Sequence, residues 1–229
     1  SNIKETVFPG GIYRLEDHRG WALWMALNCL DNEVAPADRA EALAILEAAR
    51  EDHNSWVWHL PVTECPQLRG LSAWHLEQLG HHGDPDWWAQ TDAKTRFEEI
   101  DVPMLHVAGW YDLYLSGTLD HFLGLKEQAR SEHSRQSQRL VIGPWTHTSA
   151  PGTDAGELSY PANAAFDALA TMEQWLDFCL EGDDNEIAGW SPVRIYLMGA
   201  VGEPDAPGNR WLSLPDWPPT TTSTDYHLA

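Results

Sequence analysis

Positive charge is scarce in this chain of 229 residues: 14 Lys and Arg residues stand against 35 Asp and Glu residues, for a formal net charge of −21. Binding to the phosphate backbone of nucleic acids depends on Lys and Arg, and so does binding to anionic membrane surfaces. We therefore expect neither a nucleic acid nor a membrane as a partner. A well-solvated acidic surface is the plainest interpretation of this charge.

Cysteine and long hydrophobic runs are also scarce. Cys29, Cys65 and Cys179 lie far apart and include no C-x-x-C pair, which argues against a disulfide framework or a zinc site. The adjacent His81 and His82 lack the spacing of known metal motifs. No apolar run approaches the roughly 18 residues that a membrane-spanning helix needs. We expect a cytoplasmic protein with no metal and no cofactor.

The first hundred residues carry helical patterns. Apolar residues recur at helical spacing, and Pro and Gly residues interrupt the patterns where helices begin or end. The pattern predicts helices over residues 15–30, 36–50, 68–79 and 85–97. With 43% hydrophobic residues, the chain has enough apolar surface to form a buried core.

Two short apolar runs in the middle of the chain end in similar ways. Met104 to Ala108 leads through a Gly-initiated turn to Asp112, and Leu140 to Ile142 leads through another to His147. Such runs are typical of buried parallel strands. The 35 positions between Asp112 and His147 suit one strand–helix–strand crossover. We expect the two side chains to meet at the carboxyl edge of neighbouring parallel strands.

An Asp and a His in this order are two members of the Ser-Asp-His triad of an α/β-hydrolase. The imidazole accepts the proton of the nucleophilic serine, and the carboxylate holds the imidazole in the productive tautomer. Taken singly, Asp112 could cap a turn and His147 could be an ordinary loop histidine. Their joint occurrence at two strand ends favours the catalytic interpretation. No G-x-S-x-G nucleophile motif occurs in the sequence.

The motifs resemble a known superfamily. Gly109-Trp110-Tyr111-Asp112 and Gly143-Pro144-Trp145-Thr146-His147 resemble the cocaine esterase-like and X-Pro dipeptidyl-peptidase superfamily of serine hydrolases, the CocE/NonD group. Glu186 stands where that group usually has Gly. Weaker similarities flank the two motifs, at residues 8–11, 175–177, 184–187, 193–199 and 216–219.

This resemblance implies a partial α/β-hydrolase fold lacking the nucleophile segment. Residues 1–100 would form a helical cap, residues 101–190 the C-terminal part of the α/β core, and residues 191–229 the start of a C-terminal β jelly roll. Asp112 and His147 would be catalytic, and Tyr114 would bind substrate. The resemblance implies cleavage of ester or amide bonds, in acyl compounds or X-Pro peptides, and inactivity of this chain alone.

Only two core strands are apparent, too few for a doubly wound sheet. We therefore expect the exposed strand edges to be covered, either in a homo-oligomer or by association with the missing N-terminal part. The alternative function is a non-catalytic binding or assembly module derived from such a hydrolase. A nucleophile motif upstream of Ser1 would distinguish the two functions.

Overall fold

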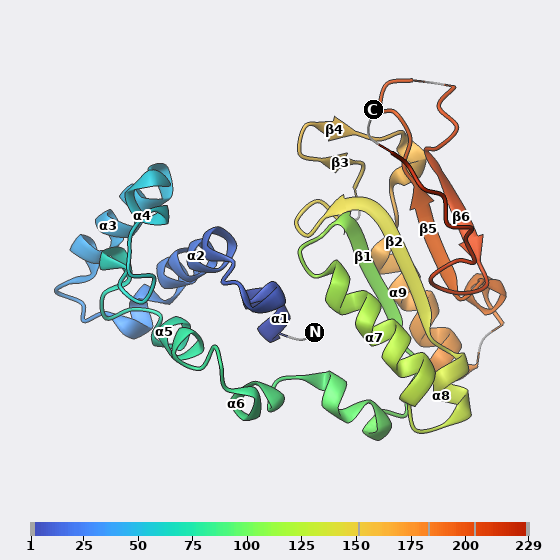
Figure 1. The fold of residues 1–229 in the computed structure, drawn as a ribbon, viewed down its shortest axis with the longest axis horizontal. Helices are drawn as coiled ribbons and strands as arrows, with labels where there is room; N and C mark the ends of the chain where they lie inside the picture. Colours follow the sequence, from blue (N-terminus) through green and yellow to red (C-terminus); the bar gives the residue numbers. More distant parts are fainter. Residues whose placement is uncertain (1–2, 151, 183, 204, 228–229) are drawn as a thin grey trace. The chain divides into compact units, whose positions relative to one another are not determined.

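The computed structural model describes residues 3–150, 152–182, 184–203 and 205–227. The chain separates into two compact units, residues 3–92 and residues 93–227 (Figure 1). Because the positions of the two units relative to one another are not determined, each is described by itself.

The described part of the N-terminal unit is helical. Its α-helices are α1 (Ile3–Val7), α2 (Leu15–Glu33), α3 (Arg39–Glu51), α4 (Asn54–Val57), α5 (Ala73–Gly80) and α6 (Pro85–Ala89). The helix predicted from residue 15 is confirmed. The helix predicted from residue 68 begins only at Ala73, because Ser72 has a left-handed φ of 50° that an α-helix does not accept.

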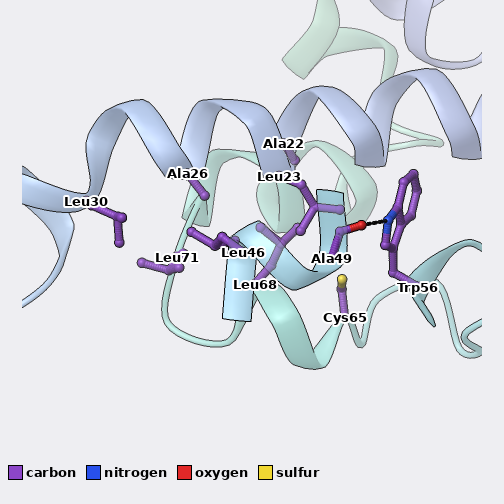
Figure 2. Close-up of a cluster of buried hydrophobic side chains, with 10 residues drawn as sticks. All are labelled: Ala22, Leu23, Ala26, Leu30, Leu46, Ala49, Trp56, Cys65, Leu68 and Leu71. Carbon is purple, nitrogen blue, oxygen red and sulfur yellow. Dashed lines mark hydrogen bonds between the residues drawn. The ribbon is translucent and has the colours of Figure 1, made fainter. Parts of the chain in front are cut away.

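The core of this unit lies between α2 and α3. Ala22, Leu23 and Ala26 of α2 pack with Leu46 and Ala49 of α3 (Figure 2). Leu30, Trp56, Cys65, Leu68 and Leu71 complete this apolar cluster.

A buried arginine ties the following loop to α2. Arg19 is fully buried, and its guanidinium donates hydrogen bonds to the carbonyl oxygens of Trp56, His59 and Val62. Burial of a charged group requires such partners. Arg19 therefore fixes the course of residues 56–62 beside the helix.

The C-terminal unit contains a four-stranded sheet in the order β1-β2-β5-β6. The strands are β1 (Leu105–Tyr111), β2 (Arg139–Thr146), β5 (Val193–Leu197) and β6 (Arg210–Leu214). β1, β2 and β5 are parallel, and β6 runs antiparallel to β5. A small hairpin of β3 (Asp154–Ala155) and β4 (Leu158–Ser159) follows β2.

Helices connect the strands and cover the sheet. α7 (Leu115–Gln128) and α8 (Glu132–Gln136) form the crossover from β1 to β2, and α9 (Ala168–Leu176) precedes β5. α7 lies over one face of the sheet and α9 over the other (Figure 1). Phe122 of α7 packs against Leu140 and Ile142 of β2. The predicted strand–helix–strand crossover between neighbouring parallel strands is therefore confirmed.

The structure corrects the expected number of core strands. We expected two core strands, yet β5 and β6 continue the same sheet. Residues 193–199, which contain β5, were expected at the start of the jelly roll, because a sequence pattern marks a strand but not the strand beside it. The guanidinium of Arg194 lies 4.0 Å from the centroid of the Trp190 ring, which accommodates the cation beside the sheet. A jelly roll is not seen in the described residues.

The edge strands of the sheet are β1 and β6. Among the described residues, β1 pairs only with β2 and β6 pairs only with β5. In the residues that the structure describes, no helix combines the length and the apolar character that crossing a lipid bilayer requires.

Candidate active site

Asp112 follows directly after the last residue of β1. Its backbone N–H donates to the carbonyl of Gly109, and its Oδ1 accepts a hydrogen bond of 2.8 Å from the N–H of Tyr114. The side chain is only 10% exposed. Asp112 therefore caps the turn that leads from β1 into α7, which was one of the two roles considered for it from the sequence. Its Oδ2 remains available for a second partner.

That second partner is His147, which follows directly after β2. Nδ1 of His147 lies 3.2 Å from Oδ2 of Asp112. The predicted contact is therefore present, at the carboxyl edge of two neighbouring parallel strands. The imidazole is 54% exposed. Within the described part of the chain, Nε2 of His147 has no hydrogen-bond partner, so it is available to accept a proton from another group.

Tyr114, the third predicted site residue, lies against the same histidine. Its ring contacts the ring of His147 edge to face, with centroids 4.8 Å apart and an interplanar angle of 63°. Tyr114 is the residue before α7, and its carbonyl accepts hydrogen bonds from the backbone and side chain of Thr118. The structure thus brings all three predicted residues together. Their catalytic and substrate-binding roles remain predictions.

Two glycines make room for Trp145 where β1 and β2 end. A Cβ atom at Gly109 would lie 2.0 Å from the carbonyl oxygen of Trp145, and one at Gly143 would lie 2.3 Å from the Trp145 indole. Trp145 is fully buried, and its indole N–H donates to the carbonyl of Ala164. The pairing of β1 with β2 shifts register between Gly109 and Tyr111, a local irregularity typical of strand ends near functional sites.

Sequence reasoning missed the contacts that hold the loop after His147. Thr146 and Ser149 exchange hydrogen bonds of 3.0 Å, from the N–H of each to the side-chain oxygen of the other. These two hydroxyl residues enclose His147 in a tight turn. In the sequence, the only indication of these hydrogen bonds was a Thr and a Ser close to a strand end. Ser and Thr commonly stabilise turns through their hydroxyl groups.

A tyrosine pair connects the end of β1 with the segment that follows β4. The hydroxyl groups of Tyr111 and Tyr160 lie 2.8 Å apart, and that of Tyr160 donates to the sulfur of Met198 at 3.2 Å. Burial, followed by the hydrogen bond to Tyr111, raises the pKa of Tyr160 well above its usual value. Tyr160 therefore stays protonated at neutral pH and ties the segment after β2 to the end of β1.

The described residues contain no group of three or more His, Cys, Asp and Glu side chains that could hold a metal ion. His81 pairs instead with Asp84 at 3.1 Å and stacks on the ring of Trp87. The chemistry that the site offers is proton transfer through a half-exposed imidazole beside a carboxylate.

We predict that Asp112 sets the tautomer of His147. A carboxylate only accepts hydrogen bonds, so it favours a proton on Nδ1. In Asp112→Asn, the N–H of Tyr114 should keep the amide oxygen on its side, so the NH₂ group would face Nδ1. Long-range ¹H–¹⁵N NMR of neutral His147 should report the Nδ1–H tautomer in the unaltered chain and the Nε2–H tautomer in this variant.

The exposed Asp177→Asn serves as the matched control and should leave the tautomer of His147 unchanged. An Nε2–H tautomer in the unaltered chain would contradict the predicted orientation of the imidazole.

The chain is similar to known hydrolases and peptidases. A family model described as X-Pro dipeptidyl-peptidase (S15 family) matches residues 1–149. The chain is 28% identical over 227 residues to a cocaine esterase from Rhodococcus sp. (strain MB1 Bresler), a match that covers 96% of this chain and 37% of that protein. It is also 28% identical over 123 residues to a putative serine esterase from Mycobacterium bovis, covering 53% of this chain and 17% of that protein.

These curated relatives are much longer than the chain, which spans 37% or less of their length. Among solved structures, a CocE/NonD family hydrolase from Staphylococcus aureus matches with a TM-score of 0.43 and 18% identity, covering 66% of this chain and 22% of that one.

Proposed function

Because the chain belongs to the X-Pro dipeptidyl-peptidase (S15) family, we propose that it is a portion of a serine hydrolase that cleaves ester or amide bonds. The observation that carries this proposal is the 3.2 Å contact between Nδ1 of His147 and Oδ2 of Asp112. In this arrangement Nε2 of His147 accepts the proton of a serine hydroxyl and later delivers it to the leaving group.

Asp112 acts through the histidine. Its carboxylate keeps the imidazole proton on Nδ1 and stabilises the imidazolium that forms when Nε2 takes up a proton. The carboxylate is itself held by the N–H of Tyr114, so its position does not depend on the histidine. The nucleophilic serine and the groups that stabilise the oxyanion belong, in this proposal, to residues outside this sequence.

We propose a small ester or amide, or a short peptide, as the substrate. The ring of Tyr114 stands against the imidazole of His147 and would contact the acyl group beside the reacting bond. The esterase names of the relatives support the ester among these alternatives.

The unpaired edge of β1 supports a second part of the proposal. Exposed strand edges are seldom left in water, because their backbone groups pair readily with another strand. Val107 and Tyr111 of β1 are also 40% and 45% exposed. We propose that a further segment of the protein, or a second copy of this chain, covers β1. A jelly roll after residue 191 likewise remains a proposal.

Labelling with a fluorophosphonate probe tests the proposed function. We expect no labelling of the 229-residue chain, since it lacks a G-x-S-x-G motif. A protein that extends the reading frame upstream of Ser1 and carries such a motif should be labelled at one serine. Stoichiometric labelling of a serine within the 229 residues would contradict the proposal. An unlabelled longer protein with the motif intact would favour the non-catalytic module.

A further inference from the structure

A small apolar cavity lies in the N-terminal unit, between α2 and α3. Its volume is about 210 Å³. Leu23, Leu46, Ala49 and Trp56 form buried walls. Figure 2 shows these four side chains within the apolar cluster of α2, α3 and the segment that follows. The cavity involves none of the residues assigned to the hydrolase site.

The buried walls offer no free polar group to a ligand. The one polar side-chain atom among them, the indole N–H of Trp56, donates to the carbonyl of Ala49 at 3.0 Å (Figure 2). A ligand that enters must therefore be apolar over most of its surface, because an unpaired polar group in such surroundings loses its hydration without compensation.

A glycine leaves the space open. A Cβ atom at Gly20 would lie 3.4 Å from the Trp56 ring, at ordinary contact distance, so a longer side chain there would extend into the cavity. Glycine is otherwise unfavourable inside a helix such as α2. Gly20 therefore does not stabilise α2. Its effect on the structure is to leave the space beside Trp56 open.

The mouth of the cavity is amphipathic. Trp24 is 49% exposed and stacks on Trp21, with ring centroids 4.7 Å apart. The exposed Arg50 and His53 also line the cavity, and Nε2 of His53 lies 3.3 Å from a carboxylate oxygen of Glu16. These groups suit a short polar substituent that stays at the mouth while the rest of the ligand is buried.

We propose that this cavity is a binding site for a small uncharged aromatic compound with one ring. An apolar cavity of about 150 Å³ is large enough for benzene, so 210 Å³ accommodates one ring with a short substituent. An anionic ligand is disfavoured, since desolvation of its charge outweighs attraction to the exposed Arg50, and the net charge of −21 opposes its approach. A cationic ligand loses its hydration against the same apolar walls.

Binding of benzyl alcohol to the 229-residue chain tests the proposal, with benzoate and benzylamine as charged compounds of similar size. In a methyl and indole NMR titration, we expect saturable shifts at Leu23, Leu46 and the Trp56 N–H with benzyl alcohol. Intermolecular NOEs from its ring to both leucines should accompany them. Benzoate and benzylamine should bind at least about tenfold more weakly.

Gly20→Leu should fill the cavity and raise the Kd for benzyl alcohol by about tenfold or more. Gly20→Ala adds one methyl group and favours the helix, and it should raise the Kd for benzyl alcohol by less. This variant keeps the test valid if Gly20→Leu does not fold. Gly80→Leu is the matched control, because Gly80 is exposed with no atom within 4 Å of its Cβ position.

Shifts that do not saturate, NOEs to other residues, or equal affinity of well-folded Gly20→Leu would overturn the proposal. So would tighter binding of either charged compound.

Discussion

Replacing His147 by alanine should abolish nearly all hydrolysis by a protein that contains this chain together with the nucleophile. A general base in hydrogen-bond reach of the reacting proton contributes about 10²–10⁴ in rate. In the proposed mechanism the serine and the imidazole act as a unit, so the loss in kcat should lie at or above the upper end of that range. The measurement is kcat and KM for p-nitrophenyl ester hydrolysis at pH 7.5.

Asp112→Asn should lower kcat by about 10²–10⁴ with little change in KM, because in the proposed mechanism the carboxylate acts on the tautomer of the base and not on substrate binding. The exposed His133→Ala is the matched control and should leave both constants unchanged. Full activity of His147→Ala would show that His147 is not the general base, even though it contacts Asp112.

Gly109→Ala should destabilise the C-terminal unit by about 3 kcal/mol or more. The added methyl group would lie 2.0 Å from the carbonyl oxygen of Trp145, and a backbone atom of a neighbouring strand cannot move away as a flexible side chain can. Relief requires β1 and β2 to separate near their carboxyl ends. Because Asp112 and His147 follow those ends, their contact should be lost as well.

Amide hydrogen exchange of Val141 and Ile142 in β2 measures this effect locally, which matters in a chain with two compact units. Their exchange should accelerate by about a hundredfold or more, since each 1.4 kcal/mol is a factor of ten. Gly189→Ala is the matched control, because no atom lies within 4 Å of its Cβ position. Unchanged protection in Gly109→Ala would contradict this prediction, because it would show that β1 and β2 accommodate the added methyl group and stay paired.

The sequence by itself determined the parts of this protein that depend on local pattern. Short apolar runs that end at a glycine-led turn identified β1 and β2, and their spacing predicted the parallel pairing and the meeting of Asp112 with His147. This works because the carboxyl ends of adjacent parallel strands share one edge of a sheet, so the positions of two residues follow from two strand ends.

Tertiary structure alone decided the features that depend on contacts between distant residues. β5 pairs with β2, and Val193 and Ile195 of β5 pack with Phe122 of α7, but local periodicity does not reveal such neighbours. The hydrogen bond between Tyr111 and Tyr160 and the open space beside Gly20 were equally hidden. Packing is a property of surfaces brought together from separate segments, so a one-dimensional pattern shows which residues are buried but not which residues they touch.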